Sequence, residues 1–196
     1  MVKYFIKEVT LDIPDNVNLE LENKLITIKG PKGIIKKNFY HAKDIEIELK
    51  ENKLIFKAVF PRKKTAAKLG TLKSIIKNAI DGVIKGYTYR MTIAYSHFPI
   101  KLEPPTTKNG NDPIKILNFY HEEEPRIAYT AGPGITIKVD KEDVIVSGID
   151  KEMVAQTCAN IQNRCKVRRK DLRKFQDGIY VYSKEFSTGE IFWSIK

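Results

Sequence analysis

Two stretches of the chain share one pattern of apolar and polar positions. Residues 45–56 and residues 135–146 align without a gap, and both have a charged centre between apolar flanks. A period-two alternation followed by a charged turn and a short apolar run is typical of a β-hairpin. The coincident apolar pairs are Ile45/Ile135, Ile47/Ile137, Leu49/Val139, Leu54/Val144, Ile55/Ile145 and Phe56/Val146.

The surroundings of the two hairpins repeat as well. The tetrapeptide Asn-Phe-Tyr-His precedes each hairpin, at residues 38–41 and 118–121, and a helical segment follows each. Each helical region is followed by Asp-Gly and a β-branched residue, at 81–83 and 177–179. Self-similarity of this kind predicts a duplicated α+β module. Each of two tandem modules should hold a mostly antiparallel β-sheet covered on one face by one α-helix.

Helical spacing of apolar residues predicts one helix in each module. The first lies between Arg62 and Asp81, and the second begins at Asp150, whose side chain suits a helix N-cap. Apolar residues three or four apart form one buried stripe on each helix. The stripes are Leu69, Leu72, Ile76 and Ala79 on the first helix, and Val154, Cys158, Ile161 and Cys165 on the second.

A strand follows the first helix, and turn signals punctuate the rest of the chain. Tyr87, Tyr89, Met91, Ile93 and Tyr95 alternate with polar residues and should face one way. Tight turns are predicted at 30–33 and 132–134, and a loop tip at 109–113. We place the module boundary near residues 96–99. The predicted division is an N-terminal module over 1–96, a C-terminal module over 97–184 and a tail over 185–196.

Composition points to a soluble protein with a polyanionic partner. The 196 residues are 42% hydrophobic, which is enough to bury a core, and carry a net charge of +11. Such a surplus favours nucleic acid first and an anionic membrane surface second. No apolar stretch approaches the ~20 residues that span a bilayer, and the charged first ten residues are unlike a signal peptide. With Cys158 and Cys165 the only cysteines, we expect a reducing, cytosolic compartment.

The positive charge is concentrated in two clusters. Residues 51–100 hold ten basic and two acidic groups, and residues 151–196 hold ten and five. Like charges so close together repel one another unless phosphates or counterions neutralise them. A solvated helix face is the alternative interpretation, and it applies more readily to the first cluster. The first cluster is Arg62, Lys63, Lys64, Lys68, Lys73 and Lys77; the second is Arg164, Lys166, Arg168, Arg169, Lys170, Arg173 and Lys174, opposed only by Asp171.

We predict that Arg168, Arg169, Arg173 and Lys174 contact phosphate, because arginine adds planar bidentate contacts and lysine a point charge. Tyr180, just beyond the second cluster, can stack on an unpaired base if exposed. Burial in a strand is the alternative, since its neighbours are apolar or aromatic.

Motifs of catalysis are absent from the sequence. It contains no P-loop, dinucleotide fingerprint or Gly-x-Ser-x-Gly elbow. The cysteines share the predicted buried face of the second helix, so we expect core packing and no metal site. Residues 30–33 could hold a phosphate, but an ordinary tight turn is the better interpretation. We therefore expect no catalytic residue and no cofactor.

Four segments resemble the large-subunit ribosomal protein six family, called ribosomal protein nine of the 60S subunit in eukaryotes. They are Leu-Asp-Ile-Pro at 11–14, Ile-Thr-Ile-Lys-Gly-Pro-Lys-Gly at 26–33, Tyr-Ser-His-Phe-Pro-Ile at 95–100 and Asp-Leu-Arg-Lys-Phe-Gln-Asp-Gly-Ile-Tyr-Val at 171–181. The resemblance covers roughly residues 1–184, and the last two segments are similar to the archaeal and eukaryotic branch.

The resemblance implies two repeated α+β modules and a structural role in translation within the cytoplasmic ribosome. It implies binding to ribosomal RNA near the factor-binding region and the stalk base, with neighbouring ribosomal proteins as partners and no membrane or small-molecule substrate. The C-terminal module makes the main RNA contacts in the family. The positions that match here are Arg173, Lys174, Tyr180 and nearby Lys184, preceded by the bases at 164–170.

Two regions depart from the family. Residues 122–126 and 129–131 lack the expected basic character, which argues against an RNA contact there. The tail at 185–196, with Phe192 and Trp193, does not match the family; covering a neighbouring protein and packing back on the module are both open.

Three other functions remain open at this point. An RNA-binding or ribosome-assembly factor acting outside the ribosome would share the basic clusters. A nucleic-acid-modifying enzyme would need His97 or the acidic run at 122–124 to lie in a pocket. A protein-interaction module would use the charge only for solubility.

Overall fold

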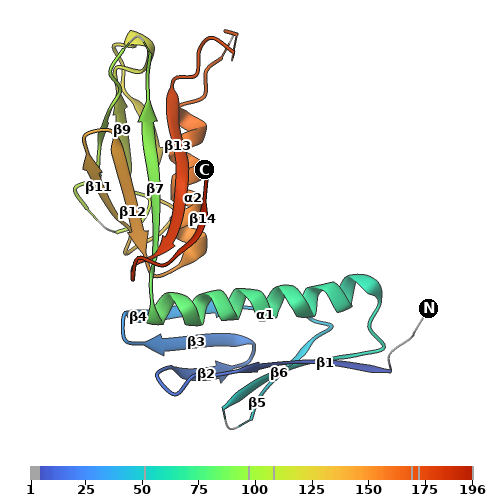
Figure 1. The fold of residues 1–196 in the computed structure, drawn as a ribbon. Coiled ribbons are helices and arrows are strands. Elements are labelled where there is room, and N and C mark those ends of the chain that lie inside the picture. The colour runs from blue at the N-terminus through green and yellow to red at the C-terminus, as the bar shows by residue number, and fades with distance from the viewer. Residues whose placement is uncertain are drawn as a thin grey trace. The chain divides into compact units, whose positions relative to one another are not determined.

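The computed structural model describes residues 5–50, 52–96, 98–107, 109–168, 170–171 and 173–195. The chain divides into two compact units, Met1–Ile84 and Lys85–Lys196 (Figure 1). Each unit combines antiparallel strands with an α-helix, so the predicted α+β class is confirmed.

The first unit packs one long helix against two small sheets. The sheets have the strand orders β1-β6-β5 and β2-β3-β4, and all neighbours are antiparallel. The helix α1 contacts strands of both sheets (Figure 1). The elements are β1 (Ile6–Asp12), β2 (Asn18–Glu22), β3 (Leu25–Gly30), β4 (Gly33–Asn38), β5 (Glu46–Lys50), β6 (Lys53–Val59) and α1 (Lys63–Ile84).

The apolar stripe of α1 is buried as predicted, but the helix runs further than the sequence suggested. Gly82 and Val83 continue the buried face, and Gly30, the last residue of β3, packs against Val83. A Cβ placed on Gly30 would lie 2.6 Å from Val83 Cγ2. Because α1 extends to Ile84, the Asp81-Gly82 pair lies inside the helix, whereas Asp177-Gly178 lies at the start of the strand β13 (Gly178–Phe186). The predicted equivalence of these two pairs is wrong, because side-chain burial keeps the first one helical.

The second unit has a five-stranded and a three-stranded antiparallel sheet, with orders β11-β12-β7-β13-β14 and β10-β9-β8. The helix α2 packs against β7, β10, β12 and β13 (Figure 1). The elements are β7 (Tyr87–Ala94), β8 (Lys101–Glu103), β9 (Pro113–Leu117), a 3-10 turn (Phe119–His121), β10 (Arg126–Tyr129), β11 (Thr136–Asp140), β12 (Asp143–Gly148), α2 (Lys151–Arg164), β13 (Gly178–Phe186) and β14 (Ile191–Ser194).

The start and the buried face of α2 are as predicted. Asp150 has extended backbone angles, and its carboxylate accepts a hydrogen bond from the N–H of Glu152, which satisfies one of the free donors of the first turn. Val154, Cys158, Ile161 and Cys165 are all buried. No helix in the described part of the chain is long and apolar enough to cross a membrane.

The two hairpins have the same register. Leu49 pairs with Leu54 in the first unit, and Val139 pairs with Val144 in the second. At the aligned positions 56 and 146, Phe56 and Val146 are both fully buried. The alignment of apolar positions therefore reflects a repeated structure and is not an accident of alternation.

The units divide earlier than the predicted boundary near residues 96–99. Strand β7 shows the predicted alternation, with Tyr87, Tyr89, Met91 and Ile93 buried, but its hydrogen-bond partners are β12 and β13 of the second unit. Residues 185–196 are also not a separate tail, since β13 runs to Phe186 and β14 pairs with it. The ring of Phe192 lies against Tyr87, so this segment packs back on its own unit.

Candidate nucleic-acid interface

The C-terminal basic segment, residues 164–174, connects the end of α2 to β13. Arg169 lies outside the described residues, and the other six basic residues are exposed. Among the described contacts, no acidic group pairs with the side chains of Lys166, Arg168 or Lys174. These three cations face solvent with their charge uncompensated, which is the condition for binding an anionic backbone.

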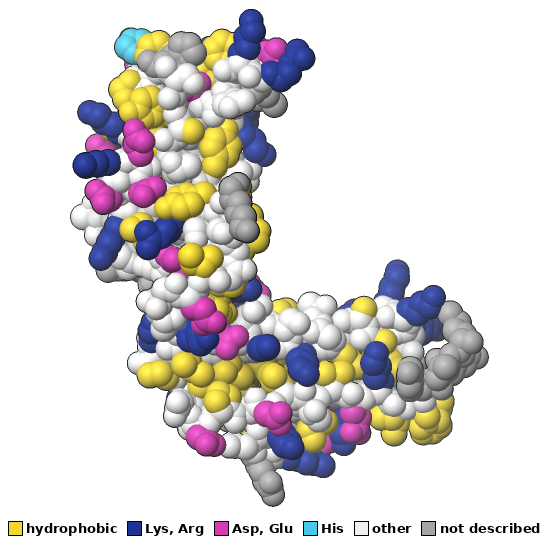
Figure 2. Space-filling view, viewed as in Figure 1, with side chains coloured by type: hydrophobic (Ala, Val, Ile, Leu, Met, Phe, Trp, Pro, Cys, Tyr) yellow, Lys and Arg dark blue, Asp and Glu magenta, His cyan; other side chains and the backbone are white. Residues whose placement is uncertain are grey.

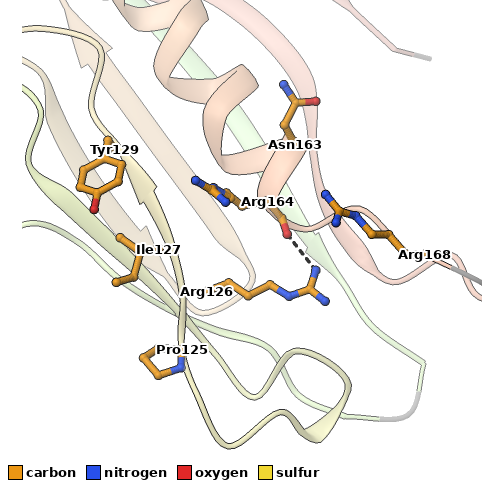
Figure 3. Close-up of a pocket in the computed structure, with 7 residues that line it drawn as sticks. All are labelled: Pro125, Arg126, Ile127, Tyr129, Asn163, Arg164 and Arg168. Carbon is orange, nitrogen blue, oxygen red and sulfur yellow. Dashed lines mark hydrogen bonds between the residues drawn. The ribbon is translucent and has the colours of Figure 1, made fainter.

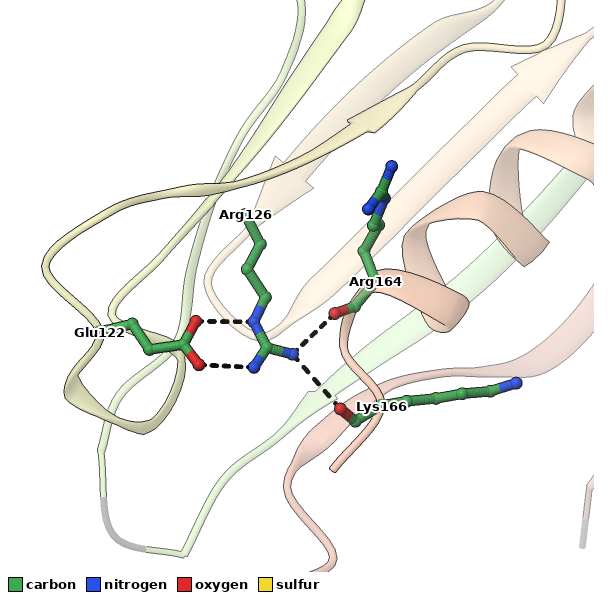
Figure 4. Close-up of polar contacts among 4 residues, drawn as sticks. All are labelled: Glu122, Arg126, Arg164 and Lys166. Carbon is green, nitrogen blue, oxygen red and sulfur yellow. Dashed lines mark hydrogen bonds and ion pairs between the residues drawn. The ribbon is translucent and has the colours of Figure 1, made fainter. Parts of the chain in front are cut away.

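Arg126 of β10 holds the start of this segment (Figure 4). Its Nε and Nη2 atoms donate to both carboxylate oxygens of Glu122, at 2.7 and 2.6 Å. Its Nη1 atom donates to the carbonyl oxygens of Arg164, at 2.9 Å, and Lys166, at 3.3 Å. The last carbonyls of a helix lack partners within the helix, so one guanidinium both terminates α2 and directs the chain that follows.

The surroundings of Arg126 keep this bridge charged. The guanidinium lies 4.2 Å from the centre of the Phe119 ring, which adds a cation–π contact. Hydrogen bonding from Arg126 lowers the pKa of Glu122, and hydrogen bonding to Glu122 raises the pKa of Arg126. In the sequence, residues 122–126 are a departure from the family and the acidic run within them is a candidate catalytic site, and this structural role was missed.

Lys170 is held by aromatic rings. Its Nζ atom lies 4.2 Å from the centre of the Tyr120 ring and 4.8 Å from that of Phe175. The Tyr120 hydroxyl donates to Asp177, whose carboxylate also accepts from the backbone N–H of Ser96. Burial, reinforced by the bond to Asp177, raises the pKa of Tyr120 to about 12. Lys170 thus helps to anchor the segment, while remaining exposed.

Arg173 is exposed and paired locally. Its guanidinium lies 3.2 Å from the carboxylate of Asp171, and its side chain is 90% exposed. Hydrogen bonding from Arg173 lowers the pKa of Asp171. A pair this exposed is weak in water, so Arg173 is free to exchange Asp171 for a phosphate.

Tyr180 and Lys184 lie on β13, beside a hollow of about 420 Å³ between α2 and the β13–β14 hairpin. Tyr180 is 39% exposed, and its hydroxyl donates to the carbonyl of Gln176 at 3.2 Å. Lys184 lies over the ring of Trp193, 4.3 Å from its centre. The two predicted positions are therefore close in space, although both are partly engaged within the unit.

A second hollow lies beside the C-terminal basic segment and is called the groove below. It has a volume of about 660 Å³. Residues of β10 line one side, and the end of α2 with Arg168 lines the other, where the Arg164 side chain points across toward β10 (Figure 3). The lining residues are Pro125, Arg126, Ile127, Tyr129, Asn163, Arg164 and Arg168.

The first basic cluster lies on α1. Arg62, Lys63, Lys64 and Lys68 are exposed at the beginning of the helix, and Figure 2 shows basic side chains gathered over α1. Lys68 approaches Asp44 at 3.9 Å, which is a weak pair at the surface. This face can neutralise phosphates through its exposed charges.

The acidic run at 122–124 does not line a pocket among those described. Glu122 is bound to Arg126, and Glu123 and Glu124 are exposed on a loop. His97 lies outside the described residues. Within the described residues no group of His, Cys, Asp or Glu side chains could hold a metal ion. Burial raises the pKa of Cys158 and Cys165 to about 12, which fits the predicted packing role.

Comparisons with known proteins agree with this picture. The family model described as ribosomal protein L6 matches residues 13–86 and 123–178. The large ribosomal subunit protein uL6 of Staphylothermus marinus is 42% identical over 172 residues, which cover 88% of this chain and 91% of the relative. The uL6 proteins of Ignicoccus hospitalis and Methanosarcina mazei are 41% and 40% identical and cover 89% and 91% of this chain, and 93% and 99% of their own lengths. A basic α+β chain with two repeated units and these relatives belongs to the ribosomal protein L6 family.

Proposed function

We propose that this chain binds ribosomal RNA in the large ribosomal subunit through its C-terminal basic segment, near the factor-binding region and the stalk base. The relatives are large-subunit proteins, and the family is a structural, non-enzymatic part of the cytoplasmic ribosome. The role is to neutralise phosphates so that RNA helices can pack closely. Specificity then comes from the shape of the RNA more than from reading its bases.

One observation carries this proposal: exposed, uncompensated cations stand on a backbone that the protein itself holds in place. The Arg126 bridge fixes the carbonyls of Arg164 and Lys166, and Lys170 is seated on two rings. Residues held in place before binding lose less conformational freedom when they meet RNA. Order and charge together favour a specific RNA contact over a purely solubilising charge.

The residues of the segment should contribute unequally. Lys166, Arg168 and Lys174 have no acidic partner among the described contacts, so they should contact phosphate directly. Arg173 should contribute less, because it must first break its ion pair with Asp171. Lys170 should also contribute less, because its ammonium group lies over the rings of Tyr120 and Phe175. The exposed bases at the start of α1 would form a second and weaker contact.

The test is the salt dependence of RNA binding. Replacing Arg168 by alanine in the full chain should lower the slope of log affinity against log salt by ~0.7–0.9, because one fewer phosphate is neutralised. Binding is measured by filter retention with a large-subunit RNA fragment at several salt concentrations. Lys138→Ala removes an exposed lysine on β11 and serves as the matched control, with an unchanged slope expected.

Equal slopes for Arg168→Ala and Lys138→Ala would contradict a phosphate contact at Arg168. Sedimentation separates the main alternative. A constituent of the ribosome stays with large subunits in high salt, whereas an assembly factor outside the ribosome is released into the free fraction.

A further inference from the structure

We propose that the groove between β10 and the end of α2 binds one unpaired nucleotide of an RNA. In this arrangement the base stacks on Tyr129, and Arg164 and Arg168 hold the phosphate. The inference rests on the proposed function for the identity of the partner as RNA. It adds a ring-stacking site in a region whose sequence argues against RNA contact.

One wall of the groove is apolar and exposed. Pro125, Ile127 and Tyr129 are alternate residues and therefore project to the same side of β10. Ile127 is 38% exposed and Tyr129 is 42% exposed, while the intervening Ala128 is buried. The exposure of these two side chains leaves the apolar strip open to a ligand.

At the C-terminal end of β10 the helix α2 already bonds to the backbone, which disfavours addition of a peptide strand there. Asn160 of α2 donates from Nδ2 to the carbonyl oxygen of Tyr129 at 2.8 Å. The hydroxyl of Thr157 accepts a hydrogen bond from the N–H of Ala131 at 3.0 Å. Strand addition needs free backbone donors and acceptors, and α2 already occupies these two. The groove therefore offers side chains to a ligand.

The opposite wall is cationic. The guanidinium groups of Arg164 and Arg168 have no acidic partner among the described contacts, and Asn163 is an exposed amide beside them. Arg126 contributes to the lining but is committed to Glu122 and to the helix end. The two free arginines thus supply charge, and the amide supplies a donor and an acceptor.

An unpaired nucleotide matches both walls. It has a flat apolar face for the tyrosine ring and an anionic group for the arginines. A duplex presents phosphates but hides its base faces, so it would leave the apolar wall uncovered. An acidic peptide supplies charge without a flat face. The volume of about 660 Å³ lies within the ~300–1,000 Å³ common for small-ligand sites.

The experiment compares two RNA probes on the full chain, single-stranded hexauridylate and a blunt 16-base-pair RNA duplex. Tyr129→Leu should weaken hexauridylate binding about 5- to 150-fold, the range expected for loss of one stacked base. Its affinity for the duplex should change less than about two-fold. Tyr129→Phe keeps the ring and should bind as the native chain does. Tyr95→Leu is the control, because Tyr95 is also 42% exposed but lies outside the groove.

Each other outcome has a distinct meaning. If Tyr129→Leu leaves hexauridylate binding unchanged while Arg168→Ala weakens both probes, the groove does not stack a base, and the proposed function stands. If hexaglutamate competes as well as hexauridylate, the groove recognises charge alone and the inference falls. If Arg168→Ala changes neither probe, Arg168 contacts no phosphate and this inference falls; if Lys166→Ala and Lys174→Ala also change neither probe, the proposed function fails as well. Thermal unfolding of Tyr129→Leu must match the native chain, and if it does not, Ile127→Ser on the same wall takes its place.

Discussion

Replacing Arg126 by methionine tests whether one guanidinium holds the C-terminal basic segment. Methionine keeps an apolar stem over Phe119 but removes every hydrogen bond of the bridge. The carbonyl oxygens of Arg164 and Lys166 then lose their side-chain donor, and Glu122 loses its cation. We expect the end of α2 to fray and the following residues to lose their fixed course.

The size of the effect follows from the contacts. The Glu122 pair is partly exposed, with side-chain exposures of 42% and 25%, so it contributes about 1 kcal/mol at most. The two carbonyl bonds contribute roughly 1 kcal/mol each or somewhat less for the longer one, and the ring contact about 0.5 kcal/mol. The free energy of unfolding should fall by about 3 kcal/mol. For a unit of slightly more than 100 residues this lowers Tm by roughly 13 °C.

The assay joins thermal unfolding to amide hydrogen exchange. Circular dichroism of the full chain gives Tm, and exchange should speed up at residues 164–168 while it stays unchanged in the core of β7. Glu122→Gln is the control, because it keeps the carbonyl bonds and should lower the free energy of unfolding by only about 1 kcal/mol. If Arg126→Met lowers Tm by less than about 2 °C and leaves amide exchange at residues 164–168 unchanged, then Arg126 does not hold the end of α2.

Two further predictions concern packing. Gly30→Ala should lower the free energy of unfolding by about 1–3 kcal/mol, because its Cβ would lie 2.6 Å from Val83 Cγ2. Gly70→Ala on α1 should raise the free energy of unfolding by about 0.5–1 kcal/mol, because a Cβ there has no atom within 4 Å. Urea denaturation measures both changes in stability. If both variants shift the stability in the same direction, the packing at Gly30 is contradicted. Burial raises the pKa of Cys158 and Cys165 to about 12 from a usual value near 9.0, so their stabilising contribution is complete below pH 9 and is lost at higher pH, as the unfolded thiols ionise first. Stability should therefore fall less between pH 8 and 10.5 in a Cys158→Ala/Cys165→Ala variant than in the native chain, and an equal fall would count against their buried state.

The repeated hairpins could be predicted because their information is local. Alternation over a few residues decides which side chains are buried, and the turn decides which pairs meet. Both helices could be predicted for the same reason, since the stripe of α1 and the N-cap of α2 depend on residues within a few turns.

The unit boundary could not be predicted in this way, because it depends on pairing between distant strands. In the first unit, Val9 of β1 pairs with Phe56 and Leu11 pairs with Leu54. In the second, Tyr89 of β7 pairs with Val146 and Met91 pairs with Val144. Strand β7 thus plays in the second unit the part that β1 plays in the first. Adjacency in sequence suggested that it closes the first module, whereas hydrogen bonding shows that it opens the second.

The residues of the proposed RNA-binding site were predicted from charge alone. A run of bases is visible in any sequence, and the six described members of the C-terminal basic segment are exposed. The Arg126 bridge was missed, because two of its acceptors are backbone carbonyls some 40 residues away, and carbonyls have no sequence signature. The four-residue spacing of Glu122 and Arg126 was available as a signal, but it suggests an ion pair mainly within a helix.

The spacing between tetrapeptide and hairpin explains where the groove came from. Both tetrapeptides bury their phenylalanine and form the same turn, in which the carbonyl of Phe39 or Phe119 accepts from the N–H three residues later. Seven positions then lead from Asn38 to the first hairpin, whereas seventeen lead from Asn118 to the second. The longer connection holds β10, with Arg126 and the apolar wall. The duplicated scaffold therefore accounts for the fold of both units, and the longer connection in the second unit supplies the Arg126 bridge and one wall of the groove.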